Sequence, residues 1–264
     1  MIAPLEAAAR ETGRTVYAAV LRACYTRTGL PWAVHDAVLR IDPRVRHLVP
    51  HANEPEVFRF IHQSIAPGDA VLDVGAFLGV YAILEARLAG PDGRVIAFEP
   101  TPWSAAIARR HFRYNHLGPD RLTLIEAAVS DRPGRGVLHE YPEPYVNSLS
   151  LAVDSAAAPR ATAVAMVTID EMCARTGVVP SFIRMDVQGA ELHALRGAVE
   201  TIRAAGRRVT LVVEMHPQCW PSFGVTPGEV RDAIEDLGLE AAPLEAHGVP
   251  FGVDAHAVLR PRRA

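Results

Sequence analysis

Short apolar runs alternate with longer stretches of helical spacing from about residue 54 onward. A short apolar run that ends at Gly, Pro or Asp is typical of a buried strand, and apolar residues at every third or fourth position are typical of a helix. The predicted strands are 70–74, 94–98, 122–126, 181–186 and 208–214. The predicted helices are 54–65, 79–89, 103–116, 168–176, 189–204 and 226–237.

This alternation predicts an α/β fold with an open, mostly parallel sheet that is covered on both faces. Two more apolar runs, 239–244 and 253–260, have no long helix between them and are predicted to pair antiparallel. The stretch 131–163 is rich in Pro, Gly, Ser and Ala and is predicted to form a hairpin and a loop. In such a sheet the ligand binds at the carboxyl ends of the strands.

Residues 1–50 differ in character from the rest, because apolar residues recur there at roughly helical spacing between arginines and acids. We therefore predict an N-terminal helical cap or lid over 1–50 and a catalytic domain over 51–264. A cap packed on the core is the simpler interpretation, and a lid or a homodimer contact is the alternative.

The composition fits one large globular domain, with 264 residues, 49% hydrophobic residues and a formal net charge of −3. The near-neutral charge argues against a nucleic-acid partner and against a polybasic membrane patch. No apolar run approaches the ~18 residues that a membrane span requires. Charged residues interrupt the first fifteen positions and argue against a signal peptide, and the three separate cysteines argue against disulfides, so we expect a cytoplasmic protein.

All 27 basic residues other than histidine are arginines, and the chain contains no lysine. Enzymes that depend on a Schiff-base lysine, a lysine base or a P-loop lysine are thereby excluded.

The first predicted strand runs into a glycine loop, from Asp73 through Gly75 and Ala76 to Gly79. A dinucleotide fingerprint would need glycines at 77 and 80, where this chain has Phe77 and Val80. An acid beside this loop disfavours a pyrophosphate and suits a cationic ligand such as S-adenosylmethionine.

The next strand ends at Glu99, whose carboxylate is able to accept hydrogen bonds from two ribose hydroxyls. Together, the loop and Glu99 predict a site for S-adenosylmethionine.

Several ordered motifs over roughly 54–216 resemble the FkbM family of S-adenosylmethionine-dependent methyltransferases. They are VLDVGAFLGVY (71–81), IAFEP (96–100), AAVSD (127–131), NSLS (147–150), VTIDEM (167–172), FIRMDVQGAELHALRGA (182–198) and LVVEMHP (211–217). The resemblance implies a Rossmann-like class I methyltransferase fold, with a seven-stranded, mostly parallel sheet and a terminal antiparallel strand.

The resemblance also implies which residues bind the cofactor. It assigns the methionine end to the loop residues Asp73, Gly75, Ala76 and Gly79, the ribose to Glu99, and less distinctive pocket positions to Pro100 and Ala128.

The chain departs from the family's usual motifs at three positions. Phe77 replaces the asparagine of G-A-N-I-G, and Arg184 and Gln188 replace the lysine and the glutamate of K-x-D-V-E-G. An arginine cannot act as a base and a glutamine carries no charge, so the base must be sought elsewhere.

Three candidate catalytic residues lie at predicted strand ends: His216, Asp186 and Glu214. Histidine is the usual general base near neutral pH, so His216 is the first choice. Asp186 and Glu214 would orient the acceptor, or each would serve only its own loop or helix end. The three are also able to hold Mg²⁺, although the sequence predicts no metal site.

We therefore expect a methyltransferase that methylates a hydroxyl of a small molecule, such as a natural product or a sugar. The alternatives are an N-methyltransferase acting on a small molecule or a macromolecule, and a non-catalytic protein that binds the cofactor.

Overall fold

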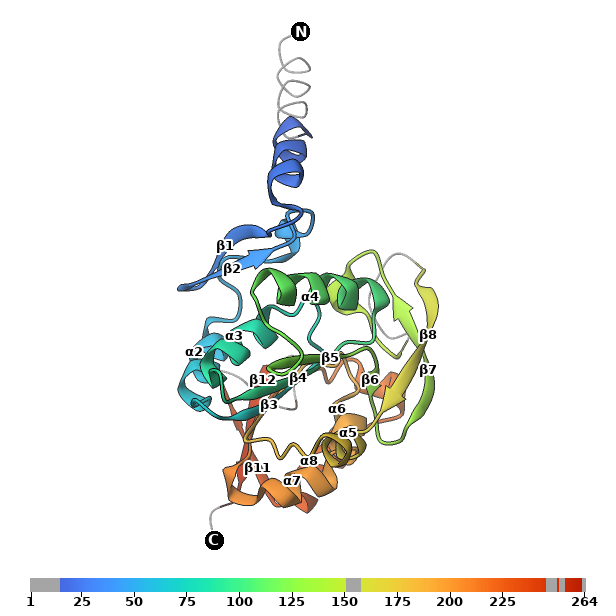
Figure 1. Ribbon diagram of the computed structural model, residues 1–264. Helices are drawn as coiled ribbons and strands as arrows, with labels where there is room; N and C mark the ends of the chain where they lie inside the picture. Colours follow the sequence, from blue (N-terminus) through green and yellow to red (C-terminus); the bar gives the residue numbers. More distant parts are fainter. Residues whose placement is uncertain (1–14, 151–157, 246–250, 252–254, 263–264) are drawn as a thin grey trace.

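The computed structural model describes residues 15–150, 158–245, 251 and 255–262. Its main sheet has seven strands in the order β11-β12-β10-β9-β3-β4-β5 (Figure 1). The strands are β3 (Ala70–Val74), β4 (Arg94–Phe98), β5 (Leu122–Ile125), β9 (Phe182–Met185), β10 (Thr210–Met215), β11 (Leu239–Pro243) and β12 (Ala255–Pro261).

Strands β5, β4, β3, β9 and β10 are parallel, and β12 runs antiparallel to both β10 and β11. The predicted mostly parallel sheet with a terminal antiparallel pair is confirmed. The chain builds outward from β3 to β5 and then returns to the other side of β3 with β9. This reversal makes the carboxyl ends of β3 and β9 the place where a ligand crevice opens.

Helices cover both faces of the sheet (Figure 1). Helices α2 (Pro55–Ser64), α3 (Val80–Ala89) and α4 (Pro102–Tyr114) lie on one side, and α5 (Ile169–Thr176), α6 (Glu191–Arg196), α7 (Val199–Ala205) and α8 (Pro227–Asp236) lie on the other. Neighbouring residues of β3 enter different cores, since Val71 belongs to the first and Leu72 to the second. None of the helices in the described part of the chain is long and apolar enough to cross a bilayer.

The single helix predicted over 189–204 is two helices, α6 and α7. The break falls at Gly197, where an added Cβ would lie 2.1 Å from the carbonyl oxygen of Ser130. This close approach leaves no room for a side chain, so a glycine is required at the point where the two helices meet. Helical periodicity continues through the break, which is why the pattern did not reveal it.

The prediction of a wholly helical segment over 1–50 is wrong for its second half. Residues 15–25 are helical, but β1 (Leu30–Val34) and β2 (Ala37–Ile41) form an antiparallel hairpin. Burial alternates along both strands, as expected of a hairpin with one face on the core. Residues 1–14 lie outside the described part of the chain.

A buried histidine of α4 ties this hairpin to the glycine loop. The ring Nε2 of His111 accepts from the backbone N–H of Asp42 at 2.9 Å, and Nδ1 lies 2.8 Å from the carbonyl oxygen of Leu78. Burial lowers the pKa of His111 to about 4, so the ring is neutral and donates through Nδ1 to Leu78.

The predicted hairpin in 131–163 is present as β7 (Gly134–Glu140) and β8 (Arg160–Val167), which pair antiparallel. An unpredicted short strand, β6 (Ala128–Val129), joins β8 in parallel. The remaining short elements are 3₁₀ turns at Arg46–Leu48, Pro144–Val146, Gly206–Arg208 and Trp220–Phe223.

Candidate active site

The carboxyl ends of four neighbouring strands bring predicted site residues to one edge of the sheet. Gly75 follows β3, Glu99 follows β4, and Asp186 follows β9. Glu214 is the second-to-last residue of β10, and His216 directly follows the strand. Two cavities open along this edge, and we name them after the carboxylates that line them.

The Glu99 cavity has a volume of about 690 Å³ including its mouth. Its walls are mainly apolar and come from the ends of β3, β4, β5 and β9. The lining residues include Gly75, Phe98, Glu99, Pro100, Ala127, Ala128, Asp186 and Gln188. The structure therefore places four of the predicted cofactor residues at this cavity, namely Gly75, Glu99, Pro100 and Ala128.

Glu99 is buried and fixed by the backbone on either side of it. Its Oε1 accepts from the backbone N–H of Thr101 at 2.7 Å, and its Oε2 accepts from that of Phe77 at 2.8 Å. Burial raises the pKa of Glu99 to about 7, against the lowering effect of these hydrogen bonds. Each carboxylate oxygen keeps a further lone pair, so Glu99 is able to accept from two adjacent hydroxyls of a ligand.

The two glycines of the loop are required for packing rather than for space beside a ligand. Gly75 has φ +87°, and an added Cβ would lie 1.8 Å from the carbonyl oxygen of Asp186. Gly79 has φ +74°, and its Cβ would lie 2.4 Å from the ring of Phe112 in α4. Gly79 lines neither cavity, whereas Ala76 lines the second one.

Asp73 is fully buried, lines neither cavity, and is paired with Arg184. One guanidinium nitrogen of Arg184 lies 3.1 Å from Asp73, and the other lies 3.2 Å from Asp186. The guanidinium also lies over the ring of Tyr81, 4.4 Å from its centroid. Burial raises the pKa of Asp73, although the charge of Arg184 acts in the opposite direction. Arg184 thus holds the two carboxylates that end β3 and β9.

The second cavity, the Glu214 cavity, has a volume of about 1330 Å³ including its open mouth. Glu54, Tyr81, Arg184 and Glu214 line it, together with the N-terminal residues Val34, His35, His47, Leu48, Val49, Pro50 and Asn53. Among the described residues, five line both cavities: Gly75, Phe77, Tyr145, Asp186 and Gln188. The two cavities therefore meet across a common wall, and Asp186 is the only carboxylate among these five residues.

His216 is buried behind this wall and lines neither cavity. Its Nδ1 lies 2.9 Å from Glu191, and its Nε2 lies 2.9 Å from the amide nitrogen of Gln188. Burial lowers its pKa, but the hydrogen bond and charge of Glu191, with the charges of Asp186 and Glu214, raise it to about 9. A charged ring has no free lone pair, and a neutral one accepts from Gln188. In both states the Nε2 of His216 is unavailable as a base.

Sequence reasoning missed the part that Gln188 and Glu191 play. Gln188 donates to Asp186 at 3.1 Å while it contacts His216. Glu191, fully buried, accepts from the backbone of Gly189 and from the indole of Trp220, in addition to its contact with His216. The motif DVQGAE (186–191) was the available signal, with Gln188 two residues after Asp186 and Glu191 three residues after Gln188. Trp220 itself is fully buried.

Asp186, Glu214 and His216 do gather, since one ligand atom of each lies within 4.8 Å of the others. The contact between His216 and Gln188 occupies the nitrogen that would face a metal here.

Among known protein families, the model of the methyltransferase FkbM domain matches residues 73–240. No curated protein matches the sequence.

Solved structures that resemble the fold include cofactor-bound Rv0187 from MTB, at 20% identity and a TM-score of 0.46, with 81% of this chain and 83% of that chain covered. The O-methyltransferase from Bacillus cereus in complex with SAH is 14% identical, with a TM-score of 0.46 and coverage of 82% and 84%. Precorrin-6y C5,15-methyltransferase from Geobacter metallireducens GS-15 is 12% identical, with a TM-score of 0.47 and coverage of 81% and 90%.

The Glu99 cavity has features that fit S-adenosylmethionine. Its buried carboxylate is able to accept hydrogen bonds from ribose hydroxyls, and its mainly apolar walls are able to hold an adenine. The family match covers more than half of the chain, from the glycine loop to the start of β11. The chain therefore belongs to the FkbM family and is an S-adenosylmethionine-dependent methyltransferase.

Proposed function

We propose that this enzyme methylates a hydroxyl group of a small molecule that binds in the Glu214 cavity. The observation that carries the proposal is the common wall of the two cavities. A cofactor in the Glu99 cavity and an acceptor in the Glu214 cavity would meet at Gly75, Asp186 and Gln188. Methyl transfer needs this alignment of the nucleophile with the methyl group.

The cofactor supplies an electrophilic methyl group, and the protein must position the acceptor oxygen and take its proton. Asp186 is the best-placed carboxylate, because it alone among the three predicted catalytic residues lines both cavities. Arg184 and Gln188 hold its two oxygens in place. We assign to Asp186 the removal of the proton from the acceptor's hydroxyl, and to Glu214 the binding of the acceptor. His216 then acts as a positioning residue, through Gln188.

The charge of the Glu214 cavity supports a hydroxylated small molecule over a nucleic acid. Glu54, Asp186 and Glu214 line it, and Arg184 is the guanidinium among them. Carboxylates accept hydrogen bonds from hydroxyls, whereas they repel a phosphate backbone. An acceptor that carries an amine would also be attracted, which keeps N-methylation as the second candidate.

Calorimetry with S-adenosylhomocysteine and a turnover assay on a panel of hydroxylated and amine-bearing small molecules test the proposal. We expect Asp186→Asn to lower turnover by about 100-fold or more, the usual effect of losing a general base. Its affinity for S-adenosylhomocysteine should change little. Asp232→Asn, on the exposed side of α8, is the matched control.

Three results would contradict the proposal in different ways. Unchanged turnover in Asp186→Asn would remove Asp186 from proton transfer. Methylation of amines alone would favour the second candidate. Cofactor binding without turnover on any acceptor of the panel would favour a non-catalytic binding protein.

A further inference from the structure

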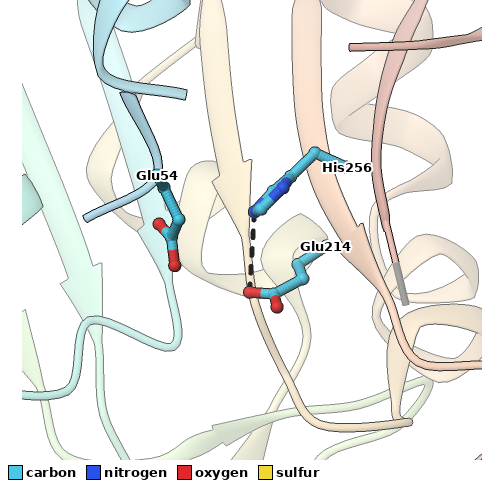
Figure 2. Close-up of side chains that lie close together, drawn as sticks. All are labelled: Glu54, Glu214 and His256. Atoms are coloured by element: carbon cyan, nitrogen blue, oxygen red, sulfur yellow. Dashed lines mark ion pairs between the residues drawn. The ribbon is translucent and has the colours of Figure 1, made fainter. Parts of the chain in front are cut away.

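Three side chains that are not part of the common wall, Glu54, Glu214 and His256, lie close together (Figure 2). Glu54 precedes α2, Glu214 lies in β10 and His256 lies in β12. One ligand atom of each lies within 4.8 Å of the others. Glu214 and His256 are directly paired residues of antiparallel strands, so the sheet fixes their separation.

A fourth residue orients the imidazole of His256. Its Nδ1 lies 2.7 Å from Oε1 of Glu245, and its backbone N–H donates to Oε2 of the same carboxylate at 3.3 Å. The other ring nitrogen, Nε2, is buried and makes no hydrogen bond within the described part of the chain. A carboxylate bonded to one nitrogen of a histidine whose other nitrogen faces further ligands is the usual outer shell of a metal site.

The distances suit a bound ion better than a direct hydrogen bond. Nε2 of His256 lies 3.6 Å from Oε2 of Glu214, which is too long for a hydrogen bond. Two ligands that each lie about 2.1 Å from a tetrahedral ion are about 3.4 Å apart. The gap between these two atoms is therefore close to the edge of a coordination tetrahedron.

The charges also leave room for a cation. Within the described part of the chain, the hydrogen-bond donors to Glu54 are neutral: the hydroxyl of Tyr81 at 2.8 Å and the side-chain amide of Asn53 at 2.9 Å. Glu54 therefore brings a negative charge that no described arginine neutralises directly, next to the carboxylate of Glu214.

We propose that Glu54, Glu214 and His256 bind a divalent ion of the Zn²⁺ or Mn²⁺ type. Two carboxylates and one imidazole match the ligand preferences of these ions. Glu54 and Glu214 line the Glu214 cavity, so an open coordination position would face the acceptor and bind one of its oxygens. This last step rests on the proposed function, whereas binding of the ion does not.

Metal content and metal affinity of tag-free protein test the proposal. Mass spectrometry of the purified protein and calorimetric titration with Zn²⁺ and Mn²⁺ should give about one ion per chain. Glu54→Gln and His256→Gln each remove a ligand and should abolish measurable binding. Glu245→Gln removes only the outer carboxylate and should weaken binding about 10- to 100-fold.

Matched controls come from α2, where Glu56 is half-buried and paired with Arg59, and His62 is exposed. Glu56→Gln and His62→Gln make the same chemical changes at residues outside the cluster and should bind the ion as the unaltered protein does. Circular dichroism and S-adenosylhomocysteine affinity report whether each variant still folds, and they separate loss of the metal from failure of the methyltransferase site.

Two results would overturn the proposal. The first is the absence of a bound ion together with no heat on titration with either metal, which would leave His256 as an ion-pair partner of its two glutamates. The second is binding that Glu54→Gln and His256→Gln leave intact, which would place the ion elsewhere.

Discussion

The ionisation of Glu99 should control how tightly the cofactor binds. Its pKa of about 7 places the change of charge in the physiological range. Only the carboxylate accepts from two ribose hydroxyls, because protonation turns one oxygen into a donor. If binding requires the charged form, the apparent Kd is the intrinsic Kd divided by the charged fraction. That fraction falls about tenfold between pH 8 and pH 6, so affinity should fall about tenfold as well.

Glu99→Gln tests the same reasoning at constant pH. The amide keeps one acceptor oxygen, and its nitrogen must face a ribose hydroxyl or one of the backbone N–H groups that now donate to Glu99. One lost hydrogen bond to a charged group is about 1.5–3 kcal/mol, which is about a 10- to 150-fold increase in Kd at pH 8. The pH dependence should vanish with the carboxylate.

The assay is calorimetric titration with S-adenosylhomocysteine at pH 6, 7 and 8. Glu126→Gln is the control, since this partly exposed carboxylate pairs with Arg109 and lines neither cavity. A Kd for Glu99→Gln within about twofold of the unaltered protein at pH 8 would refute the assignment of Glu99 to the ribose. An unaltered protein whose affinity does not change between pH 6 and pH 8 would refute the ionisation argument alone.

Further predictions concern stability. Gly75→Ala should lower the free energy of urea unfolding by about 2–4 kcal/mol, because its Cβ would meet a carbonyl oxygen at 1.8 Å and φ is +87°. Gly177→Ala, at φ +69° in open space, should lower it by only about 1 kcal/mol. Equal losses in the two variants would contradict the packing argument. Arg184→Ala should lower the free energy of unfolding by about 3–5 kcal/mol, because it leaves Asp73 buried without a counter-charge. A loss below about 1 kcal/mol would contradict this expectation. His111, with a folded pKa of about 4 against about 6.5 unfolded, gives stability that is present above pH 6.5 and falls by roughly 3 kcal/mol as the pH drops to 4. Unfolding of His111→Gln should lack this part of the acid sensitivity.

The sheet could be predicted because its strands are short apolar runs that end at Gly, Asp or Glu. Strands β3 and β4 agree with their predicted bounds at 70–74 and 94–98, since burial on both faces leaves a continuous apolar signal. The hairpin of β1 and β2 was missed because the helical spacing of residues 5–23 was extended to residue 50, past Gly29 and Pro31, which interrupt a helix. The chain reverses at His35, with φ +53°, and the residues on either side of it form two almost wholly apolar strands.

The residues that line the Glu99 cavity were easier to predict than those that line the Glu214 cavity. Glu99 follows a strand and faces its cavity, so its position on the chain implies its place in the fold. His216 also follows a strand, but Gln188 separates it from the cavities. Glu54 lines the Glu214 cavity and accepts a hydrogen bond from Tyr81, although it lies at the start of a helix far from Glu214 in sequence. No local pattern encodes such a contact.

The close approach of Gly75 to the carbonyl of Asp186 has a thermodynamic consequence. The backbone of the glycine loop at Gly75 and the backbone that carries Asp186 touch without a side chain between them. Any displacement of one on ligand binding must therefore be matched by the other. Linkage then requires reciprocity: by whatever factor S-adenosylmethionine changes the affinity for the acceptor, the acceptor changes the affinity for S-adenosylmethionine by the same factor.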